Sequence, residues 1–67
     1  MSNAEITFPN VTVELPGDRD YDVIATVREA ILNEVGEREA LAWTMAAVLC
    51  SSHEQLVRFA RMSVNVI

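Results

Sequence analysis

The sequence predicts a small α+β domain of the order β-α-α-α-β. Its short C-terminal strand pairs with an N-terminal strand, and two to three helices lie between them. Apolar and polar residues alternate in "VTVEL" and again in "SVNVI", which is the period of a strand. Between these segments, apolar residues recur at steps of three and four, the period of a helix. Residues 1–67 are expected to form a single domain, with residues 1–5 flexible.

The chain is short for a self-sufficient core. Sixty-seven residues, 51% of them hydrophobic, lie near the lower limit for a stable single domain. The only cysteine is Cys50, so an intramolecular disulfide cannot compensate for a small core. Association with a second copy is the remaining common solution, and the sequence therefore predicts a homodimer.

The first strand is predicted over residues 11–15, with residues 6–8 as a weaker extension. The alternation changes phase between these two segments at residues 9–10, "PN", which predicts a bulge or bend there. Residues 16–17, "PG", end the strand, because proline cannot donate to a ladder and glycine accepts turn dihedrals.

The first helix is predicted over residues 21–35. Asp18 or Asp20 is expected to cap it, and Gly36 suits the position just after its end. Its apolar face is expected to comprise Ile24, Val27, Ile31 and Val35, widened by Val23 and Leu32.

The second helix is predicted to begin at about Glu37, and it is apolar on all sides. One face carries Leu41, Met45, Val48 and Leu49, and the other sides carry Ala42, Trp43, Ala46, Ala47 and Cys50. A helix that is apolar all round is buried all round, and a domain of this size has little protein to surround it. We therefore expect a second copy to supply part of the cover.

A third, short helix is predicted over residues 52–61. Ser51 with Glu54 fits a capping box, and Ser52 with Gln55 fits a second register of the same motif. The helix is expected to bury Leu56, Phe59 and Ala60 and to expose Arg58 and Arg61. The alternating end of the chain then predicts a strand that pairs with the first one, in the same chain or in a neighbour.

Charge and hydropathy restrict the function. The net charge of −5 repels a phosphate backbone, so nucleic acid is not an expected partner. The beginning of the chain does not resemble a signal peptide, and the longest apolar run, "ALAWTMAAVLC", is about half the length of a membrane span. The sequence predicts a cytoplasmic protein with a reduced Cys50 and no membrane association.

Three patterns that suggest chemistry have simpler explanations. Cys50 and His53 place a thiol near an imidazole, but no oxyanion hole accompanies them and two ligands are too few for zinc. The acids of "DRDYDVIATVRE" have the spacing of a calcium loop, yet Val23 stands where that loop needs glycine, and helix capping explains the same residues. We predict no catalytic residues, no metal, no cofactor and no enzymatic activity.

The sequence also predicts where a partner binds. Trp43 is either the main core side chain or a binding hot spot, and burial is the favoured interpretation. As interaction residues we predict Trp43, Met45, Val64, Val66 and Ile67.

The stretch "VTVELPG", followed by "DVIATVREAI" and closing with "RMSVNVI", resembles a family of short, mostly uncharacterised proteins of actinobacteria and their phages, mycobacteriophages especially. Ile24, Val27, Arg28, Ala30 and Ile31 match the helix pattern of that family. Members often carry a terminal tryptophan where this chain has Met62 or Ser63, so a role of that aromatic does not transfer. The resemblance implies a small accessory protein without catalytic residues.

These observations favour a non-enzymatic homodimer that binds another protein, such as a host factor if the chain is encoded by a phage. The alternatives are a ribbon-helix-helix regulator of transcription and a minor virion or assembly component. A ribbon-helix-helix protein shares the order of a strand followed by two helices, but its strand reads DNA with basic or amide side chains. Here Thr12 and Glu14 occupy those positions.

Overall fold

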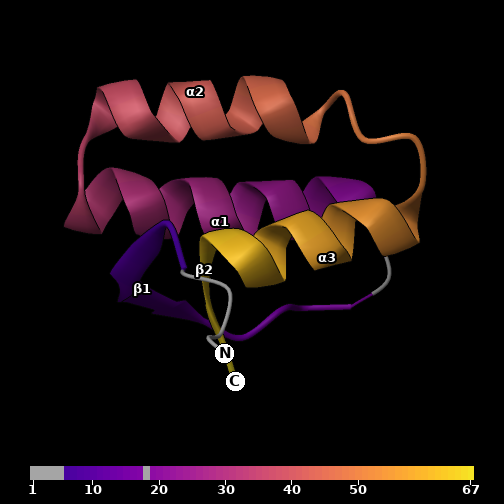
Figure 1. The fold of residues 1–67 in the computed structure, drawn as a ribbon, viewed down its shortest axis with the longest axis horizontal. Helices are drawn as coiled ribbons and strands as arrows, with labels where there is room; N and C mark the ends of the chain where they lie inside the picture. The colour runs from indigo at the N-terminus through magenta and orange to yellow at the C-terminus, as the bar shows by residue number, and fades with distance from the viewer. Residues whose placement is uncertain (1–5, 18) are drawn as a thin grey trace, which may run out of the picture.

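The computed structural model describes residues 6–17 and 19–67 (Figure 1). Its elements are β1 (Phe8–Val13), α1 (Asp20–Glu34), α2 (Glu37–Ala47), α3 (His53–Ser63) and β2 (Val64–Val66). The predicted α+β class and the β-α-α-α-β order are confirmed. The expected flexibility of residues 1–5 and the expected cap at Asp18 lie outside the described residues.

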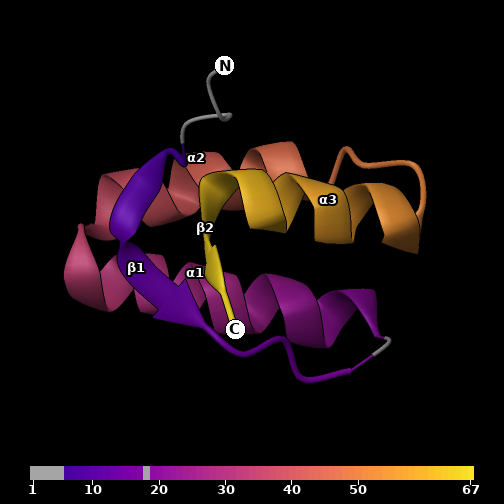
Figure 2. The same ribbon diagram turned by 60° about the horizontal axis from the view of Figure 1, so that its bottom comes forward.

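The two strands form a parallel sheet within one chain, and they run side by side in Figure 2. β2 follows α3 without a loop, so the end of α3 sets the position of the last strand. Val64 is fully buried, and the backbone N–H of Ile67 donates to the Val13 carbonyl over 3.0 Å. The predicted pairing of the chain end with the first strand is therefore confirmed, and it is intramolecular.

The predicted irregularity in the first strand is also present. Phe8 pairs with Val64 and Thr12 pairs with Asn65, so β1 advances four residues while β2 advances one. The Asn65 side-chain amide donates to the Pro9 carbonyl over 2.6 Å across this interruption. A side-chain hydrogen bond thus replaces a ladder bond where the backbone bulges.

β1 ends at Val13, two residues before the predicted end of the strand at Leu15. The reason is the length of its partner, because Val66 pairs with Val13 and only Ile67 follows. Leu15 is half-buried and packs against the core from outside the strand.

α1 matches its predicted bounds within one residue at each end, and its C-terminal signal is confirmed. Gly36 has φ +154°, and its N–H donates to the Ile31 carbonyl over 3.1 Å. The predicted cap at Asp20 is wrong, because Asp20 is the first residue of α1 and Arg19 occupies the N-cap.

The buried face of α1 is rotated from the predicted one. It is centred on Val23, Val27 and Ile31, which are all fully buried. Val35, predicted for the core, is 45% exposed and lies after the helix end. The sheet and α2 therefore cover the Val23 side of α1 rather than its Val35 end.

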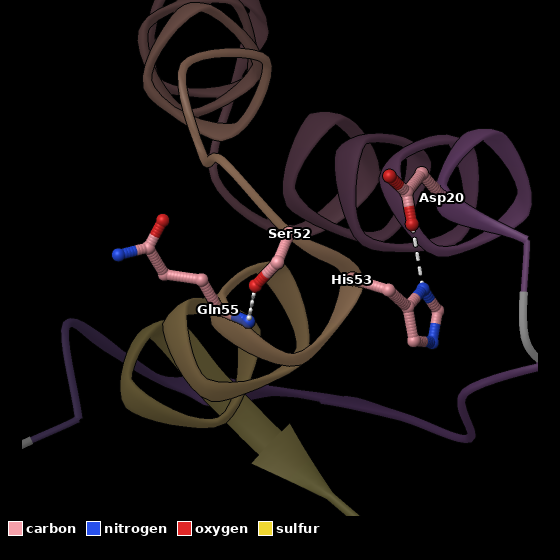
Figure 3. A network of polar contacts seen from close by, with 4 residues as sticks. All are labelled: Asp20, Ser52, His53 and Gln55. Carbon is pink, nitrogen blue, oxygen red and sulfur yellow. Dashed lines mark hydrogen bonds and ion pairs between the residues drawn. The ribbon is translucent and has the colours of Figure 1, made fainter.

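α3 begins at the second of the two predicted capping registers. Ser52 is the N-cap, and its Oγ accepts from the Gln55 N–H over 3.1 Å (Figure 3). The Gln55 side-chain oxygen accepts in turn from the Ser51 N–H over 2.7 Å, one residue before the cap. Leu56 and Ala60 are buried as predicted, Phe59 is half-buried, and Arg58 and Arg61 are exposed.

Replacing the cap tests this register. Ser52→Ala is expected to lower the free energy of unfolding by about 1 kcal/mol, because the Gln55 N–H loses its acceptor. The matched control is Ser51→Ala, which removes only an exposed hydroxyl contact to Gln55. It is expected to lower the free energy of unfolding by only a few tenths of the loss expected for Ser52→Ala. Urea unfolding of both variants measures the difference, and equal losses would show that Ser52 is not the cap.

Candidate interaction surface

α2 has an apolar surface because its sequence offers almost no polar side chain after the first turn. No charged residue occurs between Glu39 and Glu54. Thr44, the one polar residue between Ala40 and Ala47, donates its hydroxyl to the Ala40 carbonyl over 2.7 Å. The helix therefore presents hydrocarbon both to the core and to solvent.

The inward side of α2 is narrow and is centred on Trp43. Ala40, Trp43 and Ala47 are the buried residues of this helix. The Trp43 ring stacks on Phe59 with centroids 5.5 Å apart and an interplanar angle of 8°. Its indole N–H donates to Ser63 Oγ over 2.8 Å, and that hydroxyl donates to the Phe59 carbonyl. α2 is thereby joined to α3 through one side chain.

The outward side carries the larger aliphatic residues. Leu41, Met45 and Val48 are each about 60% exposed, and Leu49 is 82% exposed. Figure 1 shows α2 at one edge of the molecule, alongside α1. We call Leu41, Ala42, Met45, Ala46, Val48 and Leu49 the α2 outer face; all six are exposed.

A shallow hollow flanks the α2 outer face on each side. On the α1 side, Arg28, Leu32, Glu37, Ala40 and Leu41 line a groove of about 200 Å³. On the other side, a mostly apolar groove of about 290 Å³ lies between α2, α3 and the start of β1; it is lined by Thr7, Phe8, Glu39, Ala42, Trp43, Ala46, Phe59 and Ser63. Both grooves lie at or below the lower end of the range of small-molecule pockets, which starts at about 300 Å³. Their size suits single side chains of a protein partner.

The area of this surface can be compared with that of known interfaces. Leu32 and Val35 of the α1 end extend it, with 40% and 45% of their surfaces exposed. With the large residues of the α2 outer face they present about 350 Å² of apolar surface, at about 100 Å² per fully exposed aliphatic side chain. A standard interface buries about 800 Å² per partner, a little over half of it apolar. The patch therefore supplies most of the apolar area of one standard interface.

The predicted interaction residues do not lie together on one surface. Met45 lies at the middle of the α2 outer face, whereas Trp43 is 4% exposed and Val64 is fully buried. Val66 is half-buried, and Ile67 is 81% exposed at the end of the sheet, on the opposite side of the molecule from α2 (Figure 1). Leu41, Val48 and Leu49 were absent from that prediction, although their i, i+7 and i+8 spacing was visible in the sequence.

The side chains of Cys50 and His53 make different contacts. His53 Nδ1 lies 2.6 Å from Asp20 Oδ1, which links the first turns of α3 and α1 (Figure 3). Because an ionised carboxylate only accepts, Nδ1 donates in this contact. Both side chains are well exposed, and such pairs contribute about 0–1 kcal/mol. Cys50 is half-buried against the core.

The other described groups offer no further site. Within residues 6–17 and 19–67, no three His, Cys, Asp or Glu side chains gather as metal ligands would. Every buried side-chain nitrogen or oxygen in the same ranges has a hydrogen-bond partner. None of the described helices combines the length and hydropathy needed to cross a membrane.

Comparisons with protein-family models, with curated proteins and with solved structures find no match for this chain. Its function is therefore inferred from the geometry of its own residues.

Proposed function

We propose that this chain is a non-enzymatic interaction protein that acts in the cytoplasm as a homodimer, and that two copies bind each other through the α2 outer face. The observation that carries the proposal is the row of exposed aliphatic side chains Leu41, Met45 and Val48. The largest apolar patch on a protein surface is often functional, and covering it removes hydrocarbon from water. A core near the minimum size for folding gives the chain a second reason to associate.

The partner beyond a second copy follows from the resemblance to short phage proteins. If the chain is encoded by a phage, a host protein is the partner we propose for the surface that the homodimer leaves free. Membership of a virion or an assembly intermediate would use the same remaining surface. Copurification with particles distinguishes that role from binding of a host factor.

The ribbon-helix-helix alternative is less well supported than the interaction protein. One edge of β1 is already paired with β2, whereas a ribbon-helix-helix strand pairs with the same strand of a second copy. The exposed Thr12 and Glu14 give the outer side of this segment no positive charge for phosphate. A gel shift at low salt tests it, and tight, salt-sensitive DNA binding would favour the regulator over our proposal.

A charge at the centre of the α2 outer face tests the proposal. Met45→Glu is expected to weaken self-association by on the order of 100-fold or more, because a carboxylate buried in an apolar contact loses its water. Glutamate is a good helix former, and Met45 is 61% exposed, so the fold is expected to persist. Sedimentation equilibrium measures the dissociation constant, and circular dichroism checks the fold.

The matched control is Asn33→Glu, which adds the same charge at an exposed position of α1 opposite its buried face. It is expected to leave the dissociation constant unchanged within about two-fold. Equal weakening by both variants would contradict the role of the α2 outer face and would indicate a general effect of net charge.

A further inference from the structure

The positions of the protruding side chains and of the two grooves along α2 indicate how two copies bind each other. Leu41 and Val48 are seven residues apart, about two helical turns, so they share one side of the helix. Ala42 lies on the neighbouring stripe of α2, and Leu49 lies in the turn that follows the last residue of the helix, Ala47. Met45 lies between Leu41 and Val48 along the helix.

The grooves and the protruding side chains occupy different positions along α2. The α1-side groove includes Glu37 and Leu41 of the N-terminal half, whereas the groove beside Trp43 and Phe59, here called the aromatic groove, runs along α2 from Glu39 to Ala46. The protruding side chains Val48 and Leu49, which are 61% and 82% exposed, lie at its C-terminal end. An antiparallel pair of helices would therefore bring the protruding side chains of each copy to the grooves of the other.

We propose that two copies pack α2 against α2 in antiparallel orientation, with Met45 at the two-fold axis. In this arrangement Leu41 faces the partner's Val48, and Leu49 enters the partner's aromatic groove beside the small Ala42. Methionine suits the axis, because its flexible side chain adapts to an identical neighbour. The proposal rests on the proposed function, since it specifies the geometry of the homodimer.

Charge also favours the antiparallel orientation. The first turn of α2 carries Glu37, Arg38 and Glu39, a net charge of −1, and no charged residue follows before the end of the helix. A parallel pair would place these acids, and the two positive helix N-termini, against their own copies. The antiparallel pair separates them and sets each first turn against the uncharged C-terminal end of the partner helix.

Cysteine cross-linking tests the orientation in the full chain carrying Cys50→Ser. We expect an equal mixture of Leu41→Cys and Val48→Cys to form disulfide-linked dimers about ten-fold faster than either variant alone. In an antiparallel pair of Leu41→Cys chains, the two introduced thiols are separated by about 10 Å along the helices, which is too far for a disulfide. Cross-linking of Leu41→Cys with itself at the rate of the mixture would establish a parallel pair and overturn the proposal.

A second measurement does not depend on engineered thiols. Trp43 is the only tryptophan and lines the groove that Leu49 of the other copy would enter, so its emission is expected to shift on dilution into the monomer range. Leu49→Ala is expected to remove that shift. Sedimentation equilibrium distinguishes failure of the antiparallel geometry from failure of the homodimer. A dimer that shows neither the cross-linking pattern nor the shift in Trp43 emission contradicts the antiparallel geometry alone. A monomer at all concentrations contradicts the homodimer itself.

Discussion

Removal of residues 64–67 is expected to abolish the cooperative thermal transition of this protein. The deletion takes away β2, including the fully buried Val64, and leaves Val11 and Val13 of β1 without their cover. The buried apolar surface and the ladder bonds together are worth about 4 kcal/mol or more. A domain of this length has a total stability of about 3–10 kcal/mol, so most of its stability would be lost.

Differential scanning calorimetry of the shortened chain measures this effect. The matched control removes Ile67 alone, which is 81% exposed and contributes one backbone hydrogen bond to Val13. That variant is expected to melt cooperatively, with a loss of about 1 kcal/mol. A chain ending at Ser63 that melts as sharply and at the same temperature as the full chain would contradict the role of β2.

Trp43→Ala is expected to have the second large effect, a loss of about 3–5 kcal/mol in the free energy of unfolding. The substitution removes the side chain that joins α2 to Phe59 and Ser63, and the small surrounding domain has few residues that can fill the space. Urea unfolding followed by far-ultraviolet circular dichroism measures the loss. We expect the variant to be largely unfolded at 37 °C.

Trp43→Phe is the control for the packing contribution. It keeps an aromatic ring against Phe59 and removes the indole N–H that donates to Ser63. The Ser63 hydroxyl still donates to the Phe59 carbonyl, so the expected cost is about 1–2 kcal/mol. Similar midpoints for the alanine variant and the unchanged chain would show that Trp43 does not hold the core together.

The order of elements was predictable because local signals agree with the fold. Gly36 separates two helices that both carry helical spacing, and its N–H contact to Ile31 fits the predicted helix end. The phase change at residues 9–10 predicted the bulge that Asn65 bridges. The alternation in "SVNVI" predicted a strand, although only the fold shows that it pairs in its own chain and in parallel.

The orientation of α2 was not predictable from the sequence. Periodicity identifies the inner side of a helix by contrast between apolar and polar residues, and "ALAWTMAAVLC" has almost none. The aliphatic row of Leu41, Met45 and Val48 would have been an equally good core face. Trp43 faces inward because its ring stacks on Phe59 and its N–H finds an acceptor in Ser63.

The difference between the predicted and the observed buried face of α1 has a similar origin. Ile24, Val27, Ile31 and Val35 fit a helical stripe as well as Val23, Val27 and Ile31 do. The position of the sheet decides between them, and that position depends on the last residues of the chain. Contacts between distant segments therefore set the faces of both helices.

Sedimentation equilibrium of the unmodified protein at about 1–100 μM tests the central claim most directly, because this range spans the affinities expected for an interface of the proposed area. We expect a reversible monomer–dimer equilibrium with a dissociation constant in or below this range. A single species with the mass of one chain at every concentration would contradict the claim that a second copy covers the α2 outer face.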